Sequence, residues 1–528
     1  MGIITDQSIA AGLGVKVRNI VLQAGAAVMP RKILIIATPN AAQAASVPIN
    51  QPFLVLSPEE VAGITGTGGM AHRLAIASFR GSRSSVPTYL MLEEDAGGAA
   101  AATGSVALVG GTHGVGMIAL YIAGKFYAIF VAAADTVEQI GAAIAAAVTK
   151  DSSCPVTAAS DEGTVTFTSK SKGPWGNGIT IAVNQRPGDG ETTPSGLTVT
   201  ITAMSGGAGL PGLDTDLPLA LGSGDSANEA HFTDVIHGYG KDTSILNALS
   251  QYVGEGNENV ALYSDTIARP FRSLTADVSA ASTALADLIA FTGDRKLDRT
   301  SGVVARPGSL THPSEIAAEA MGYMAFLNAD YAELGYCDAV LSGVDPGLAA
   351  RQQGLDWTTE YANRDLAVHN GISPAIISDG AVKLQNVVSF YRPSNLPETS
   401  YCFRRMRDIS LVQNIIYNYK RVFGSEKWTN FTVVENTANV QNAKNRAKAR
   451  DTEMVKDDLL KLVTDFTSMA WLFSAAPSVA GLKKPEAVTL RENSSGFNTK
   501  VPYVLSGEGN ILNHEVDLDT SFAIMATL

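Results

Sequence analysis

Apolar and polar positions follow a repeated order of strand and helix in two stretches of the chain, residues 31–93 and 216–400. In the first stretch, Ser57 followed by Pro58 and two glutamates has the chemistry of a helix start. The expected strands are Lys32–Thr38, Val86–Glu93, Val260–Ser264, Cys337–Leu341, Ile372–Ile377 and Ala381–Phe390, and further helices are expected over Met70–Phe79, Thr243–Val253, Thr275–Phe291 and Ser314–Leu334. This alternation predicts one α/β core domain that the chain builds in two parts.

The segment between these stretches, residues 94–215, changes abruptly to a composition rich in Gly, Ala and Thr. Its short apolar runs, separated by Gly and Asn, are Val106–Val109, Met117–Ile122, Phe126–Val131, Val165–Thr168, Ile179–Val183 and Leu197–Ile201, with one helical pattern over Thr136–Val148. Short strands with frequent turn residues predict an inserted, mostly-β domain. We call residues 94–215 the insertion.

Residues 401–528, expected to form a further domain, carry two helical patterns. The first, Arg404–Phe423, has a single apolar stripe and is followed by Gly424, a common helix stop. The second covers about Val440–Phe473, with a core stripe in its second half only. We expect its first half to project from the core.

That first half contains four basic residues, Lys444, Arg446, Lys448 and Arg450. Between Arg404 and Arg450 the chain has ten basic residues against three acidic ones, whereas the whole chain has a net charge of −12. Three interpretations remain open: a solvated helix face, a nucleic-acid contact and a contact with an acidic protein surface. The nucleic-acid contact is the least favoured, because no aromatic residues are interleaved and the chain is acidic overall.

Both ends of the chain have strand patterns. Val15, Lys16, Val17 and Arg18 alternate apolar with basic residues, and His514, Glu515, Val516, Asp517 and Leu518 alternate with acidic ones. Opposite charges across neighbouring strands contribute roughly 0.2–1 kcal/mol per pair. We predict that residues 1–30 form an N-terminal arm, and that the two terminal strands pair between subunits. The alternative is that each arm folds back on its own subunit.

Composition limits the class of protein. Charged residues make up 17% of the chain, below the roughly 25% of ordinary soluble domains, as expected for a subunit that buries surface in a large assembly. No run approaches the roughly 20 apolar residues of a membrane span. The first 30 residues lack the order of a signal peptide, so we expect synthesis in the cytoplasm.

Sequence motifs of enzymes and metal sites are missing from the chain. It contains no Walker motif, no His-Glu-x-x-His and no Gly-x-Ser-x-Gly. The three cysteines, Cys154, Cys337 and Cys402, have no metal-ligand spacing, so they are expected to be buried or to form disulfides between subunits. The close carboxylates Asp214 and Asp216, and Asp189 and Glu191, are interpreted as turn residues or a weak cation site. We therefore predict no catalytic residue, no cofactor and no metal.

Several segments resemble the contractile phage tail sheath family, in particular its Mu-like branch. They are Gly371-Ile372-Ser373-Pro374 followed by Val387–Tyr391, the run Tyr401–Phe423, and Leu120-Tyr121-Ile122-Ala123-Gly124 with Asp135-Thr136, Lys172-Gly173 and Gly176-Asn177. None is a signature by itself, but their order and spacing match over most of the chain.

The resemblance implies a non-enzymatic virion protein that assembles in the host cytoplasm. Its subunits would form stacked hexameric rings around a tail tube, with the insertion facing outward and the basic helix facing the tube. Contraction would drive the tube through the host envelope during DNA delivery. The implied partners are further copies of the chain, the tail tube protein, and baseplate and tail terminator proteins, with neither direct nucleic-acid binding nor membrane insertion. The alternative is a surface-layer or adhesin-type protein whose β domain binds a ligand.

Overall fold

The structure is a computed structural model that describes residues 25–43, 47–222, 231–253, 270–392, 403–492 and 495–509. The strands predicted at 15–18, 260–264 and 514–518 lie outside these residues, as does Cys402. The chain divides into two compact units, which are described separately. The larger unit contains residues 28–421 and 505–528, and the smaller unit contains residues 1–27 and 422–504.

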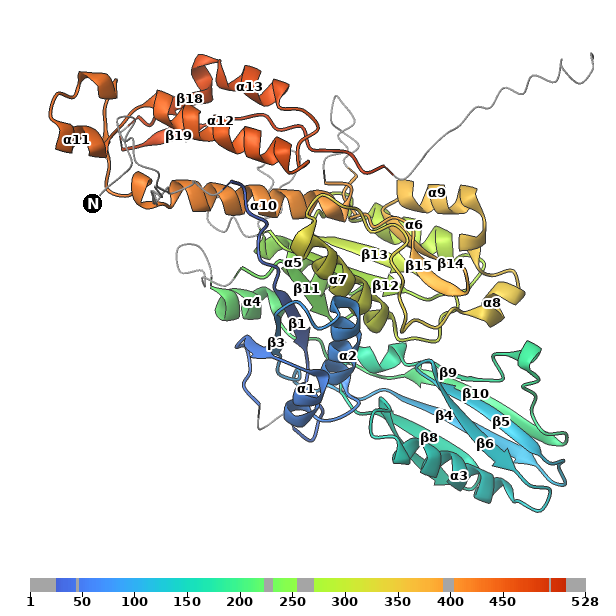
Figure 1. The fold of residues 1–528 in the computed structure, drawn as a ribbon. Coiled ribbons are helices and arrows are strands. Elements are labelled where there is room, and N and C mark those ends of the chain that lie inside the picture. The colour runs from blue at the N-terminus through green and yellow to red at the C-terminus, as the bar shows by residue number, and fades with distance from the viewer. Residues whose placement is uncertain are drawn as a thin grey trace, which may run out of the picture. The chain divides into compact units, whose positions relative to one another are not determined.

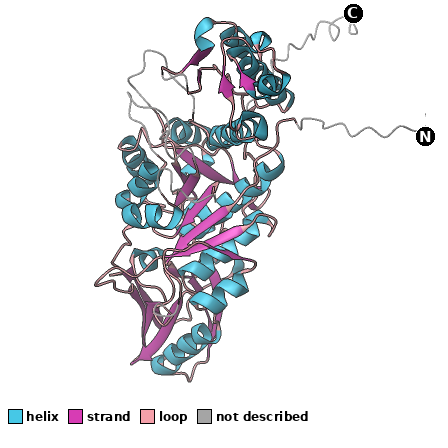
Figure 2. Cartoon of the chain, turned by 90° about the vertical axis from the view of Figure 1, so that its left-hand side faces the viewer, coloured by secondary structure: helices cyan, strands magenta, loops and turns pink. Residues whose placement is uncertain are grey.

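An eight-stranded sheet forms the centre of the larger unit, in the order β15-β14-β13-β12-β11-β1-β3-β2 (Figure 1). Its strands are β1 Ile33–Ala37, β2 Phe53–Val55, β3 Thr88–Leu92, β11 Asp234–His237, β12 Arg272–Asp277, β13 Ser301–Ala305, β14 Ile372–Ser378 and β15 Ala381–Leu384. The six inner strands are parallel, and the two edge strands are antiparallel. Every residue of β1 is buried, as expected for a strand covered on both faces, and Figure 2 shows helices on either side of these strands.

The helices of this unit are α1 Pro58–Thr65, α2 Met70–Ser82, α4 Leu213–Leu221, α5 Thr243–Tyr252, α6 Ala284–Gly293, α7 Pro313–Asp330, α8 Leu348–Gln352, α9 Tyr361–His369 and α10 Met406–Phe423, of which the last two residues belong to the smaller unit. The predicted helix start at Ser57 is confirmed, since its Oγ accepts from Glu60 N at 3.2 Å. Helices α2 and α7 approach so closely that a Cβ at Gly81 would lie 2.1 Å from Glu319 O.

The insertion forms two antiparallel sheets, with strand orders β10-β4-β8-β7 and β6-β5-β9. Their elements are β4 Thr103–Gly110, β5 Gly116–Ile122, β6 Lys125–Val131, α3 Val137–Lys150, β7 Val156–Asp161, β8 Thr164–Ser169, β9 Ile181–Val183 and β10 Leu197–Ser205. All six predicted strands and the helix are present, and Thr136 and Gln139 form a capping box at the start of α3. The sequence analysis missed β7, an edge strand that is mostly exposed. The domain boundaries at 94 and 215 stay a prediction.

Three predicted elements of the core differ from the structure, and strands β2, β11 and β13 were not predicted. The helix predicted over Thr275–Phe291 is wrong in its first part, because residues up to Asp277 belong to β12 and α6 begins only at Ala284. The strand predicted over Cys337–Leu341 is wrong, since only Val340 forms an isolated bridge, to Lys383. The last predicted strand ends early, at Leu384.

The smaller unit contains α11 Ala443–Lys448, α12 Thr452–Ser468, α13 Ala476–Leu482 and the short strands β16 Thr432–Val433, β17 Ala449–Arg450, β18 Val488–Leu490 and β19 Phe497–Thr499. The continuous helix predicted over Val440–Phe473 is wrong. It is interrupted because Ala449 and Arg450 pair with β16, and Asp451 caps α12 by accepting from Met454 N at 3.0 Å. Among the described residues, none of the helices is long and apolar enough to span a bilayer.

The close approach of α2 and α7 predicts the effect of a single methyl group. Gly81→Ala should destabilise the protein by on the order of 1–3 kcal/mol, because the added Cβ meets backbone that cannot rotate away. Gly63→Ala in α1 is the control, since its Cβ would have no neighbour within 4 Å, and it should be neutral or stabilising by up to ~1 kcal/mol. Urea unfolding measures both, and equal effects would contradict this packing.

Candidate assembly sites

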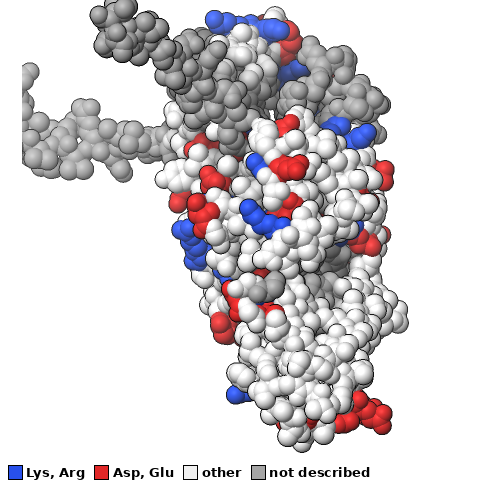
Figure 3. Space-filling view, turned by 90° about the vertical axis from the view of Figure 1, so that its right-hand side faces the viewer, with Lys and Arg blue, Asp and Glu red and all other residues white. Residues whose placement is uncertain are grey.

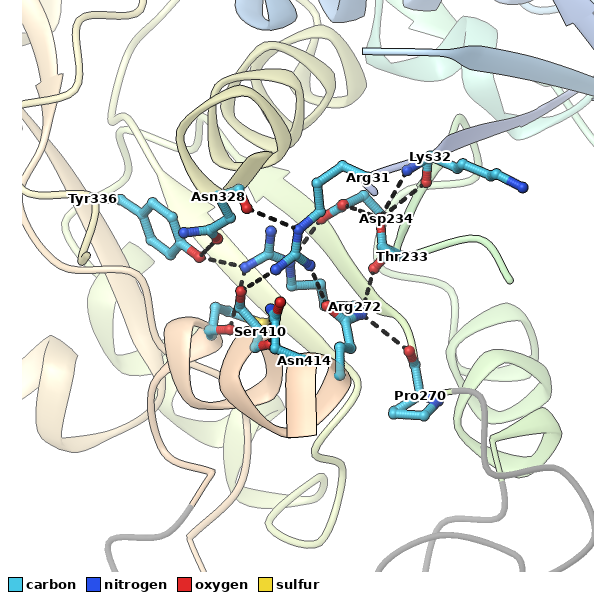
Figure 4. Close-up of polar contacts among 12 residues, drawn as sticks. Arg31, Lys32, Thr233, Asp234, Pro270, Arg272, Asn328, Tyr336, Ser410 and Asn414 are labelled. Atoms are coloured by element: carbon cyan, nitrogen blue, oxygen red, sulfur yellow. Dashed lines mark hydrogen bonds and ion pairs between the residues drawn. The ribbon is translucent and has the colours of Figure 1, made fainter. Parts of the chain in front are cut away.

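Helix α10 fixes the end of the predicted N-terminal arm and the residue that follows it. Met29 N donates to Asn414 Oδ1 at 2.7 Å, and Arg31 Nε donates to the carbonyl of Asn328 at 3.2 Å. The other two nitrogens of the Arg31 guanidinium donate to Gln413 and Ser410 of α10 (Figure 4). Arg31 is 2% exposed, so the chain is held firmly where the predicted arm ends.

Behind this contact lies a fully buried ion pair. Arg272 Nε in β12 donates to Asp234 Oδ1 in β11 at 2.7 Å, and both side chains have no exposed surface. Arg272 also donates to the Tyr336 hydroxyl (Figure 4). Burial, followed by the repulsion of Arg272, lowers the pKa of Arg31 to about 10. Two buried arginines thus lie near a single carboxylate, and the negative charge of Asp234 compensates their positive charges.

Helix α10 also fixes the segment that precedes the predicted C-terminal strand. Arg407 Nη1 donates to the carbonyl of Ser506 at 2.8 Å, and Arg405 Nε lies 3.3 Å from Glu508 Oε2. Arg407 is 1% exposed, and burial raises the pKa of the neighbouring Asp408 to about 6. Arg405, which directly precedes α10, and the first turn of α10 therefore hold residues 506–508, and the next two turns of α10 hold residues 29–31.

The four predicted tube-contact residues divide into two groups. Lys444, Arg446 and Lys448 are exposed on α11, which begins where Asn442 Oδ1 accepts from Lys444 N at 3.0 Å. Arg450 is 6% exposed and lies over the ring of Trp428, with 5.7 Å between Cζ and the ring centre.

The guanidinium of Arg450 donates to the carbonyls of Lys427, Ala447 and Ala449 at 2.7–2.9 Å. The expectation that Arg450 belongs to the projecting basic face is therefore wrong, because β17 turns it into the smaller unit. The contact with a tube is untested for the other three residues.

The other predicted sites are the strand-pairing residues, the cysteines and the possible metal ligands. The nine strand-pairing residues, Val15, Lys16, Val17, Arg18, His514, Glu515, Val516, Asp517 and Leu518, lie outside the described residues. Cys154 is buried and Cys337 is exposed, both as free thiols. In the described part of the chain, no group of three or more Cys, His, Asp and Glu side chains could hold a metal ion.

Sequence reasoning missed the buried polar face of α10. Ser410, Gln413, Asn414 and Asn418 are fully buried, and Gln413 Nε2 donates to the carbonyls of Thr233 and Pro270 at 2.8 and 3.0 Å. The only signal was their 3–4-residue spacing, which in a sequence is indistinguishable from a solvated helix face.

Removal of the Asp234 carboxylate should lower the stability of the protein strongly. Asp234→Ala leaves Arg272 and Arg31 buried without a counter-charge and should destabilise the protein by about 3–5 kcal/mol. Asp379→Ala is the control, because its ion pair with Lys383 is on the surface and Asp379 is 83% exposed, so its removal should leave the unfolding midpoint nearly unchanged. A loss below about 1 kcal/mol for Asp234→Ala would contradict the assigned role.

Comparison with known proteins gives a sequence match over part of the chain. No protein family model matches the chain. The tail sheath protein of the Mu-like prophage FluMu of Haemophilus influenzae is 31% identical over 146 residues, which are 28% of this chain and 29% of that protein's length.

Two solved structures cover almost the whole chain at low similarity. The sheath tail protein of Desulfitobacterium hafniense has a TM-score of 0.44 and 10% identity, with 94% of this chain and 97% of that chain covered. The contracted helical sheath of the anti-feeding prophage has a TM-score of 0.40 and 11% identity, with 97% and 100% covered. Over the 146 matched residues the chain is similar to a Mu-like prophage tail sheath protein, and within this segment the resemblance seen in the sequence is borne out.

Proposed function

We propose that this chain is the structural subunit of a contractile tail sheath, and that it acts by assembly and contraction rather than by catalysis. The observation that carries this proposal is the 31% identity with a tail sheath protein over 146 residues. Copies of the chain would stack as hexameric rings around a tail tube, and contraction would drive that tube through a host envelope during DNA delivery. Baseplate and tail terminator proteins would contact the two ends of the assembly.

Strand exchange between subunits would hold the rings together. The predicted arms need firm attachment points, because a pull on an arm must reach the body of its subunit. The buried contacts at Met29 and Arg31, and those from Arg407 to Ser506, provide such points on α10. Arms paired with neighbouring subunits would keep the lattice connected while the subunits rotate as rigid bodies.

The basic segment would face the tube. Lys444, Arg446 and Lys448 are exposed together on one six-residue helix, within a chain whose net charge is −12. Exposed ion pairs are weak individually, at roughly 0–1 kcal/mol, so a tube contact built from them could break during contraction. An acidic tube surface is the partner that this charge fits.

A second candidate, a surface-layer or adhesin-type protein, is favoured by one observation. Strand β6 is an edge strand in its sheet, and it exposes Phe126 at 44% and Phe130 at 78%. Figure 3 shows that the lower part of the visible face, over the insertion, carries few charged side chains. Exposed aromatic residues in such surroundings are typical of binding surfaces. An adhesin, however, has no need of two anchored arms.

Charge reversal tests the inner-face assignment. A triple variant with Lys444→Glu, Arg446→Glu and Lys448→Glu should fold normally but lose most of its co-assembly with tail tube protein, measured by co-sedimentation. The matched control reverses Lys483, Lys484 and Lys500, which are exposed on the same unit. Equal co-assembly of the triple variant and the wild type would contradict the assignment. Arg450 stays unchanged, because its side chain is part of the fold.

Deletion of the N-terminal arm tests strand exchange. A chain that lacks residues 1–22 retains Met29 and Arg31, so it should keep the unfolding midpoint of the full chain. It should nevertheless fail to polymerise, because the proposed pairing strand is missing. Thermal unfolding measures the midpoint, and sedimentation velocity and electron microscopy measure polymerisation. Normal tubes from the shortened chain would end the strand-exchange proposal.

A further inference from the structure

Two carboxyl groups, those of Glu93 and Asp216, lie near each other where the insertion joins the core. Asn50 connects their surroundings, because its backbone N–H donates to the carbonyl of Leu92 at 2.9 Å and its side chain donates to Asp216. Glu93 directly follows β3, where the chain leaves the large sheet, and Asp216 lies in the first turn of α4, where the chain has returned. Glu93 has no exposed surface, and its backbone N–H donates to the carbonyl of Ala37 at 3.0 Å. Asn50 thus links the two connections of the insertion, and the buried Glu93 directly follows the residue that Asn50 contacts.

The two carboxyl groups have unequal hydrogen bonding. Asp216 Oδ1 accepts from Asn50 Nδ2 at 3.0 Å. Neither carboxyl oxygen of Glu93 receives a hydrogen bond from another described residue. An ionised carboxylate in that position would be buried without a donor and would face a second carboxylate, which is a costly arrangement.

The other titratable groups nearby do not supply a counter-charge to Glu93. Tyr239, just beyond β11, is buried and its hydroxyl has no partner in the described part of the chain. His237 is buried, and burial lowers its pKa to about 4, which leaves it neutral. Lys172 lies 3.4 Å from Asp95 Oδ2 and is therefore already paired with a carboxylate.

We propose that Glu93 is protonated at neutral pH and donates its proton to the Asp216 carboxylate, so that the shared proton fastens the two connections of the insertion and is lost under alkaline conditions. Burial, and after it the neighbouring Asp216, raises the pKa of Glu93 to about 8 from its ordinary 4.5. The geometry points in the same direction, because only a protonated Glu93 can form a hydrogen bond with an ionised Asp216.

The direction of the pH effect follows from this raised pKa. Below pH 4.5 the carboxyl is protonated in both the folded and the unfolded chain, and the contribution of Glu93 to stability is fully present. Between pH 4.5 and 8 the unfolded chain loses this proton while the folded chain keeps it, so the contribution falls. Above pH 8 the folded chain ionises too, two buried carboxylates repel each other, and the connections of the insertion loosen.

The test is the unfolding temperature of the full chain from pH 6 to pH 9. Glu93→Gln keeps the shape and a hydrogen-bond donor without a charge, so this variant should be more stable than the wild type. The gap between them should widen by about 2 °C from pH 7 to pH 9. Glu94→Gln is the matched control, because Glu94 is the exposed neighbour in the sequence and should behave like the wild type.

Infrared spectroscopy of the folded wild type detects the same proton directly, even if the Glu93→Gln variant folds poorly. At pH 7 the folded wild type should show the carbonyl stretch of a protonated carboxyl that disappears as the pH passes 8. That band should be missing from Glu93→Gln and retained in Glu94→Gln. A parallel pH dependence in the wild type and Glu93→Gln, or the absence of a carboxyl band that titrates near pH 8, would overturn the proposal.

Discussion

The larger unit depends on the buried ion pair between Arg272 and Asp234. The pair links neighbouring parallel strands, and through Tyr336 and Asn328 its hydrogen bonds reach the residues around α7. Arg31 lies beside it and extends the network to α10. A buried charge is tolerable only when its partners are fixed, so this network imposes one position on α10 relative to the sheet. That position in turn determines where the segments next to both predicted arms are held.

This arrangement would suit the proposed sheath subunit, which would have to transmit force through its arms. Residues 29–31 and 506–508 are hundreds of residues apart in sequence, yet both contact the first three turns of α10. A load on either arm would therefore reach the same helix and the same sheet. The basic helix α11, the proposed tube contact, belongs to the smaller compact unit, whereas the anchors of the arms on α10 belong to the larger one. We infer that assembly and tube binding use different parts of the molecule.

Much of the fold was predictable because burial and turn chemistry agree locally. The run Ile33–Ala37 is apolar throughout, and Ser57-Pro58 has the chemistry of a helix cap, so both elements were identified correctly. Strand β12 was missed because Arg272, Ser273 and Thr275 are polar yet buried, and the charge of Arg272 is compensated by Asp234, which is distant in the sequence.

In the candidate sites, too, the burial of polar side chains could not be predicted from the sequence. Arg450 looks like its exposed basic neighbours in the sequence, and only the pairing of β17 with β16 turns it inward. The buried face of α10 was unpredictable for the same reason, since its polar partners come from residues 29, 31, 233 and 270. Long-range hydrogen bonds leave no periodic signal in a sequence.

Electron microscopy of the purified full-length chain, concentrated without any partner and then with tail tube protein, tests the central claim most directly. Hollow, helically striated tubes are expected, because the arms are proposed to join subunits into a lattice. Dispersed subunits under both conditions would contradict it and would favour the adhesin-type alternative.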